Sequence, residues 1–497
     1  MTAQTIPADA PDEVLPPNGP ADSAQEAHKE PSVPQRRFAG PIPQDETPQH
    51  LRASVLRLAW PSIVENALQS FLQIVTTAMV SQLGAVAIAG VGVSNQVLII
   101  AISTFFAVST ATTVLVAYNV GAGKPKEASL AAKQSYFFGF VLSGVVTLLG
   151  VFFAPRFIAL LGAAPDVVAE GGAFLRVESL GTVFLVTMMI SGAILRGTGD
   201  TRTPMLVTGF INIINVAVSL PLIFGLGPVP HLGVIGAAVG NIVARVVGCA
   251  ILLALGYKGR RGVRLAGREG WRPQLSIMRR ILGIGLPNMM ESLFRSGGMV
   301  IFAAVVVSLG TTAFAAQQVA NLFWQMALFP SFGFATAAMT LTGQSLGAHQ
   351  PDRAQRVTWI AVRACVLWMT VTGIIYFVFG HWLVGPFSAN DPEIQRIAGD
   401  ALKVICLSQP IQAIGITLAG SLRGAGDTRW PMFSTGAAMW LVRVPLAYFF
   451  GVVLGLGIPG AYAGLILDSG VVLVLNLWRY RSGRWLEARS LSVSAAD

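Results

Sequence analysis

The chain has 497 residues, of which 53% are hydrophobic and 12% are charged. Soluble globular proteins carry about 25% charged residues, so this composition argues against a soluble enzyme. The three cysteines lie in separate apolar runs and the five histidines are scattered, which argues against a disulfide framework or a metal site. No Walker-type glycine loop is present, so an ATP-driven pump lacks its usual phosphate-binding motif.

The first 50 residues differ from the rest of the chain. They hold eight acidic and three basic residues together with ten prolines, so their net charge of −5 leaves +15 for the remainder. A Pro-rich acidic stretch of this kind cannot bury enough apolar surface to fold. We expect residues 1–50 to be a disordered cytoplasmic tail, without the basic and apolar regions of a cleaved signal peptide.

Twelve segments of about 20 apolar residues follow between residues 54 and 478, each long enough to cross a hydrocarbon core of ~30 Å. They predict an all-α polytopic membrane protein with twelve transmembrane helices. The predicted parts are an N-terminal six-helix lobe (51–255), a basic cytoplasmic linker (256–280), a C-terminal six-helix lobe (281–480) and a cytoplasmic C-terminal tail (481–497).

Loops that are rich in basic residues alternate along the chain with loops that contain almost none. Eight lie between residues 258 and 280, whereas the loops on the other side are nearly bare apart from Arg156 and Arg396. The positive-inside rule then predicts a multi-pass protein of a bacterial inner (plasma) membrane with both termini in the cytoplasm. We interpret the basic linker as a topology determinant that contacts anionic lipid, not as a nucleic-acid site.

The chain repeats itself at an offset of about 226 residues. LRGTGDTRTPM at 195–205 matches LRGAGDTRWPM at 422–432 in nine of eleven positions, and Glu65 aligns with Glu291. Each half contains six predicted spans, so both halves enter the membrane in the same sense. This parallel repeat predicts two six-helix bundles with a substrate site between them near the bilayer midplane.

The repeated segments resemble the multidrug and toxic compound extrusion (MATE) family. The resemblance covers about residues 51–480 and is carried by AWPSIVENALQSFLQIVTTAMVSQLG (59–84), GLPNMMESLFRSGGMVIFAAVVVSLG (285–310), VGAG (120–123) and the doubled LRGxGDTRxPM. It implies two six-helix bundles that open alternately to each side. The implied activity is export of cationic or amphipathic organic compounds, driven by H⁺ or Na⁺.

Two departures from the family pattern affect the coupling ion. Many relatives have Val-Asp-Thr late in span 1, where this chain has Val75-Thr76-Thr77. Relatives also have an acidic residue in span 10, where this chain has the amides Gln409 and Gln412. The coupling ion therefore cannot be assigned from the resemblance.

Three acidic residues within the predicted spans are candidates for ion coupling: Glu65, Glu291 and Asp468. Glu65 and Glu291 lie about 16–18 Å into the membrane at 1.5 Å per residue. An ionisable group at this depth is a functional candidate by default, the alternative being a carboxylate that only satisfies a neighbouring helix. For Asp468, a structural ion pair with Arg443 or Arg245 is favoured over a transport role.

The two glutamates have different neighbours one turn later. Arg295 follows Glu291 by four residues, whereas Gln69 holds that position after Glu65. We therefore expect Arg295 to neutralise Glu291, and we expect Glu65, with no such cation, to be the proton carrier. Pro61 and Pro287 precede the glutamates by one turn and permit kinks that move during transport.

Amides and aromatic side chains supply the candidates for the substrate cavity. Amides can bind a cation or a substrate donor but also serve in helix–helix hydrogen bonds, and aromatic rings attract cations but also face lipid. The candidates are Asn95, Asn321, Gln69, Gln318, Gln325, Phe71 and Trp324.

Asp200 and Asp427 occupy the same position in the doubled motif. Asp before a Thr-Arg-x-Pro helix start is an ordinary N-cap, and a role in a cytoplasmic gate is the alternative.

The sequence predicts a secondary active antiporter that exports organic compounds in exchange for H⁺ or Na⁺. The alternative is a flippase for lipid-linked or polyanionic precursors, and an integral membrane enzyme is disfavoured because no His, Asp or Cys residues cluster near an interface. We expect a monomer that contacts small-molecule substrates and membrane lipids, with no nucleic acid, no metal and no cofactor beyond the coupling ion.

Overall fold

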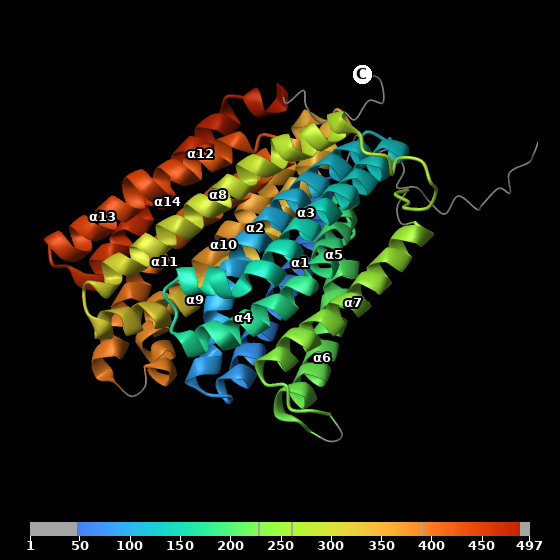
Figure 1. Ribbon diagram of the computed structural model, residues 1–497. Helices are drawn as coiled ribbons and strands as arrows, with labels where there is room; N and C mark the ends of the chain where they lie inside the picture. Colours follow the sequence, from blue (N-terminus) through green and yellow to red (C-terminus); the bar gives the residue numbers. More distant parts are fainter. Residues whose placement is uncertain (1–46, 227–228, 260–261, 389–390, 488–497) are drawn as a thin grey trace, which may run out of the picture. The chain divides into compact units, whose positions relative to one another are not determined.

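The computed structural model describes residues 47–226, 229–259, 262–388 and 391–487, which are helical with no β-strand among them. The first half contains α1 (Pro48–Ser81), α2 (Ala85–Gly121), α3 (Pro125–Leu160), α4 (Pro165–Leu180), α5 (Thr182–Gly197), α6 (Arg202–Phe224) and α7 (Val234–Lys258) (Figure 1). The second half contains α8 (Leu275–Val307), α9 (Thr311–Gly347), α10 (Pro351–Val384), η1 (Gly385–Phe387), α11 (Pro392–Gly424), α12 (Arg429–Ala437), η2 (Ala438–Arg443), α13 (Val444–Tyr448), η3 (Phe449–Val453), α14 (Gly457–Arg481) and η4 (Arg484–Glu487).

The helices begin where the sequence places residues suited to a first turn. Proline occupies the first turn of α1, α3, α4, α10 and α11, where its missing N–H has no helical partner to lose. Asp391 caps α11 by accepting hydrogen bonds from the backbone N–H groups of Glu393 and Ile394. The long apolar runs between these signals stay helical because in lipid each backbone polar group must bond within its own segment.

The predicted fold class is confirmed. Within the described residues, ten helices are long and apolar enough to span a membrane, or eleven when α4 and α5, bent by 50° at Gly181, are counted as one span. The remaining long helix, α1, has 34 residues but is less apolar. Together they account for twelve predicted spans in two repeated halves.

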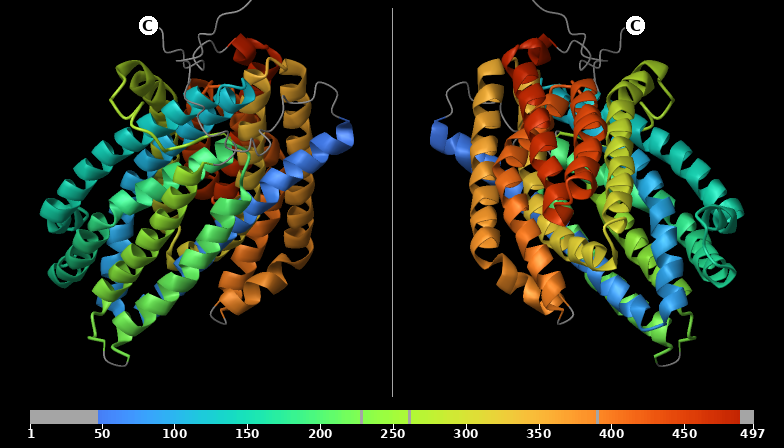
Figure 2. Two further views of the ribbon diagram at one scale, coloured as in Figure 1. Left: turned by 90° about the vertical axis from the view of Figure 1, so that its right-hand side faces the viewer. Right: turned by 90° about the vertical axis from the view of Figure 1, so that its left-hand side faces the viewer.

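The two halves are not identical copies. The bent pair α4 and α5 corresponds by the repeat to the unbroken α11, and the regular α6 corresponds to α12–η3, which contains π-helical turns in η2 and η3. Such turns often mark functional sites within membrane helices. Helix α1 crosses to the other half, where it packs against α9 (Figure 2).

Several predicted boundaries shift. Residues 1–46 and 488–497 lie outside the described residues, but α1 begins at Pro48, inside the predicted tail, because Leu51 is buried. The C-terminal tail was expected from residue 481, yet η4 folds there because the buried Trp485 stacks on Tyr480. Helices α7 and α8 both extend into the predicted linker 256–280.

The linker is bound along α3. The Lys133 ammonium donates to the carbonyls of Ala266, Gly267 and Glu269, and the Gln134 amide donates to the carbonyls of Gly270 and Arg272. Since each of these carbonyls lacks a helical partner, the two α3 side chains fix the linker in one position.

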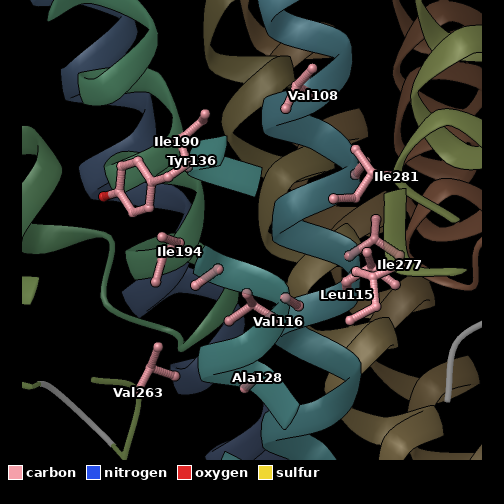
Figure 3. Close-up of a cluster of buried hydrophobic side chains, with 14 of the residues drawn as sticks. Val108, Leu115, Val116, Ala128, Tyr136, Ile190, Ile194, Val263, Ile277 and Ile281 are labelled. Carbon is pink, nitrogen blue, oxygen red and sulfur yellow. The ribbon is translucent and has the colours of Figure 1, made fainter. Parts of the chain in front are cut away.

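An apolar cluster joins helices from both halves. Val108, Leu115 and Val116 of α2 pack with Ile277 and Ile281 of α8 (Figure 3). Because each side chain is almost fully buried, this contact holds α2 and α8 together along the turns before the site described next.

Candidate functional site

A cavity of about 480 Å³ lies where the two halves meet. Its lining comes from α1, α2, α5, α6 and α7 of the first half and from α8, α9 and α11 of the second. The only ionisable side chains along it, within the described residues, are two glutamates and three arginines: Glu65, Glu291, Arg196, Arg295 and Arg423.

Glu65 forms an ion pair across two helices. The Arg196 guanidinium, in the last turn of α5, donates to both carboxylate oxygens of Glu65 at 3.0 and 3.3 Å. Both side chains are largely buried, with 9% of the Glu65 side chain and 18% of the Arg196 side chain exposed. The charge-assisted bonds therefore tie the middle of α1 to the end of α5.

Glu291 makes the equivalent contact in the second half. Its Oε1 accepts hydrogen bonds from the Arg423 guanidinium of α11 and from the Thr435 hydroxyl of α12. Its other oxygen, Oε2, is buried without a hydrogen-bond partner. Arg423 follows Glu291 by 132 residues, and Arg196 follows Glu65 by 131, so both pairs obey the internal repeat.

The cationic partners of both glutamates come from other helices, and the expected ion pair of Glu291 with Arg295 is wrong. Glu65 does have a cationic partner, Arg196, and the ion pair of Glu291 is with Arg423 rather than with Arg295. Spacing along one helix predicts only partners on the same helix, whereas Arg196 lies at the end of α5 and Arg423 at the end of α11, where the two copies of the motif begin. Arg295 is exposed to the cavity and adds an electrostatic attraction to Glu291 without an ion-pair contact.

Arg196 and Arg423 are site residues that sequence reasoning missed. Each is the first arginine of LRGxGDTR, a motif whose predicted site residue is its aspartate. The sequence does contain a pattern that could have indicated them, because a glutamate and an arginine at nearly the same separation occur in both halves.

Of the predicted substrate-cavity residues, the structure brings only Gln69 to the cavity. Phe71 is 63% exposed, and Trp324 donates a hydrogen bond to Gln412 within the second half. The remaining candidates also lie away from the lining: Asn95, Asn321, Gln318 and Gln325. The lining instead includes Asn66, Ser103, Phe106, Asn288, Phe332 and Met339.

Asp468 lies outside the cavity, in a buried cluster of the second half. It pairs with Arg443 at 3.7 Å, as one of the two expected partners, while Arg245 pairs with Glu178 at 2.6 Å. The Arg443 guanidinium also lies over the rings of Phe302 and Trp324, at 5.0 and 5.2 Å from their centroids. The arrangement ties α8, α9, η2 and α14 together.

The motif aspartates make different contacts. Asp200 accepts a hydrogen bond from the Thr203 backbone N–H at 3.2 Å, as a residue near a helix start does. Asp427 accepts one from Arg479 at the end of α14, at 2.7 Å. Pro61 and Pro287 are buried within α1 and α8 and do not line the cavity.

The halves meet tightly at the end of the bundle that carries the motif. A Cβ atom on Gly121 would lie 2.0 Å from the Gln344 carbonyl, and one on Gly347 would lie 2.0 Å from the Tyr118 carbonyl. We call these four residues the glycine seal. The side-chain amide of Gln344, a member of this seal in α9, also donates a hydrogen bond to the Gly197 carbonyl of α5 at 2.9 Å.

Further contacts between the halves lie along the next turns of α2 and α8. The Asn288 amide donates to the Thr110 hydroxyl at 3.3 Å, and the hydroxyls of Ser103 and Ser292 lie 3.2 Å apart. These residues also line the cavity, so its wall and the junction of the halves share side chains.

The MatE family model matches residues 61–220 and 287–449, one segment in each half. A probable multidrug resistance protein NorM of Thermotoga maritima is 33% identical over 453 residues, which cover 90% of this chain and 96% of that protein. An uncharacterized transporter of Bacillus subtilis, YisQ, is 28% identical over 434 residues, covering 87% and 95%. A crystal structure of a variant of the Vibrio cholerae MATE transporter VcmN has the same fold, with a TM-score of 0.82 at 19% identity over 88% of this chain and 99% of that one. The doubled segments, the two six-span halves and these likenesses agree, and the chain belongs to the MatE family as a multi-pass membrane transporter.

Proposed function

We propose that the protein exports cationic or amphipathic organic compounds from a bacterial cell in exchange for H⁺ or Na⁺, by alternating access of one cavity. The observation that carries the proposal is the pair of equivalent carboxylate–guanidinium contacts, Glu65 with Arg196 and Glu291 with Arg423, on one cavity built from both halves. The Thermotoga maritima relative, described as a probable multidrug resistance protein, supports export as the direction.

The geometry supports exchange because a coupling ion and a guanidinium compete for one carboxylate. A proton or Na⁺ that binds Glu65 removes the charge that holds Arg196, and a cationic group of the substrate competes in the same way. Binding of either cation therefore excludes the other, which is the requirement for antiport.

The uncharged part of the lining suits amphipathic compounds. Phe106, Phe332 and Met339 contribute apolar surface to the cavity, and methionine adapts to ligands of different shape. The cavity volume falls in the range of about 300–1,000 Å³ that is usual for sites of drug-sized ligands. Arg295, the third guanidinium, favours compounds of low net charge over polycations.

The flippase alternative requires a strongly cationic cavity. Of the three guanidiniums that line the cavity, two are bound by glutamates. One uncompensated charge is too little for a pyrophosphate or another polyanion, so the geometry favours the exporter.

We place the coupling ion at Glu65 and Glu291 and assign Asp468 a structural role, because its partner Arg443 is 3% exposed and the pair lies outside the cavity. The distribution of basic residues between the loops supports a cytoplasmic position for the glycine seal.

Export by purified protein in proteoliposomes tests the proposal. An imposed pH or Na⁺ gradient should drive uphill movement of a fluorescent amphiphilic cation, and an ionophore that collapses the gradient should stop it. Glu65→Gln combined with Glu291→Gln should abolish the gradient dependence, whereas the exposed Glu170→Gln should not. Uphill movement at the wild-type rate in the double variant would refute the assignment.

A further inference from the structure

The last turn of α5 connects the cavity to the junction of the two halves. Arg196, which binds Glu65, is followed at once by Gly197, the final residue of the helix. The Gly197 carbonyl is one of the four at a helix end that have no partner within the helix. Its donor is the Gln344 amide, which comes from the other half.

Gln344 is held in place from the other side. Its backbone carbonyl faces Gly121 of α2 so closely that a Cβ atom on this glycine would lie 2.0 Å away. The backbone of α9 is thus fixed against α2 while the side chain of Gln344 reaches α5. Because the side chain alone makes the link to α5, a displacement of the α5 end breaks the hydrogen bond.

The link is present in one half only. At the repeat offset of 226, the counterpart of Gln344 is Tyr118, and at the offset of 227 that holds for the doubled motif, the counterpart of Gly197 is Gly424. Both glycines pack against a helix of their own half, since a Cβ atom on Gly197 would lie 2.9 Å from the Thr113 carbonyl and one on Gly424 would lie 2.3 Å from the Met339 carbonyl. The difference between the halves is the hydrogen bond from Gln344, which reaches Gly197 from the other half. Among the described residues, no side chain of the first half donates a hydrogen bond to Gly424.

We infer that Gln344 is a positioning residue that couples ion occupancy of Glu65, and not of Glu291, to separation of the halves at the glycine seal; this rests on the proposed exchange. When a cation binds Glu65, Arg196 loses its anchor on α1 and the end of α5 is released. The hydrogen bond from Gln344 to Gly197 is then lost and α9 can leave α2. The same event at Glu291 releases Arg423, which has no equivalent link to the other half.

Distances across the seal test the inference in the full-length protein in nanodiscs. Lys126 and Asp352 are exposed and occupy the same repeat position at the starts of α3 and α10. Lys126→Cys and Asp352→Cys, in a background with Cys249→Ser, Cys365→Ser and Cys406→Ser, take the two spin labels. Double electron–electron resonance then reports the ratio of separated to sealed molecules at each pH and Na⁺ concentration.

Gln344→Met keeps the size of the side chain and removes the donor. It should raise the separated fraction without added ion, by about two- to tenfold in the ratio, as expected for one lost hydrogen bond. Glu65→Gln imitates a carboxylate occupied by a cation. It should raise the separated fraction by a similar factor in the parent protein and should cause no further rise in the Gln344→Met protein. The matched control is Gln96→Met at an exposed amide of α2.

The inference would be overturned by a Gln344→Met protein with the ion response of Gln96→Met, or by effects of Glu65→Gln and Gln344→Met that add independently. An equal response to Glu291→Gln would also overturn it. If the distances change as expected but proteoliposomes show no ion-driven export, the link stands and the proposed function fails. If export is ion-driven and Gln344→Met behaves like the parent, the function stands and the inference fails.

Discussion

Gly121 and Gly347 make a reciprocal contact, in which each faces a backbone carbonyl of the helix that carries the other. The two glycines occupy the same position of the internal repeat. The close approach of α2 and α9 therefore depends on a glycine at this position in both halves. A side chain at either position would force the two helices apart.

Gly347→Ala should therefore destabilise the protein by about 1–3 kcal/mol, the usual range for an overpacked contact. The loss of tryptophan fluorescence on heating in detergent measures it. Gly144→Ala is the control, because a Cβ atom there meets nothing within 4 Å. Equal stability of the two variants would mean that the seal has room to adjust.

The ion pair of Glu65 and Arg196 predicts strong coupling between the two positions. Glu65→Gln or Arg196→Gln alone should cost about 1.5–3 kcal/mol, because each leaves the partner's charge poorly compensated in a largely buried place. The double variant should regain most of that stability and still fail to couple export to a gradient. A thermal double-mutant cycle checks this, and additive losses would contradict it.

Glu291 should be more costly to neutralise than Glu65. Glu291→Gln removes the counter-charge of Arg423 and the attraction on Arg295, whereas Glu65→Gln affects Arg196 alone. Adding Arg295→Gln to Glu291→Gln should restore part of the stability, because it removes one of the two guanidiniums. The exposed Arg279→Gln on the same helix serves as the control and should restore none.

The start of α1 sets a limit on N-terminal truncation. Deletion of residues 1–46 should leave folding and export intact, since their composition predicts no packed structure. Deletion through residue 55 should lower the yield of folded protein, because it removes Leu51 and Val55, which are 1% and 0% exposed in a cluster with α9 and α10. Monodispersity after detergent extraction distinguishes the two, and equal yields would show that the first turns of α1 contribute little.

Composition, hydropathy and the doubled motif were sufficient for the fold class and for the two repeated halves, because both depend on properties spread over many residues. They also led to Glu65 and Glu291, since a carboxylate deep in an apolar span stands out. Their partners could not be derived in the same way. Arg196 and Arg423 lie more than 130 residues away, and the charges meet because the long arginine side chains reach from α5 to α1 and from α11 to α8.

The same limit explains the cavity candidates. The polar, repeated Asn95 and Asn321 are candidates from the sequence, but the side of each helix that faces the cavity depends on helix rotation. An almost uniformly apolar span does not specify that rotation. Boundaries shifted by a few residues where a single buried side chain, such as Trp485, extends the folded part.

The distance of 131 residues between Glu65 and Arg196 has a consequence during synthesis. At roughly 5–20 residues per second, the ribosome takes about 7–26 s to reach Arg196 after it has made Glu65. For that interval the nascent α1, already the least apolar of the long helices, holds a carboxyl group in or near the bilayer without its guanidinium. Until α5 has been synthesised, either protonation or the aqueous interior of the insertion machinery must offset the cost of this unpaired carboxylate. Glu291 is separated from Arg423 by almost the same number of residues, so the same interval applies to it.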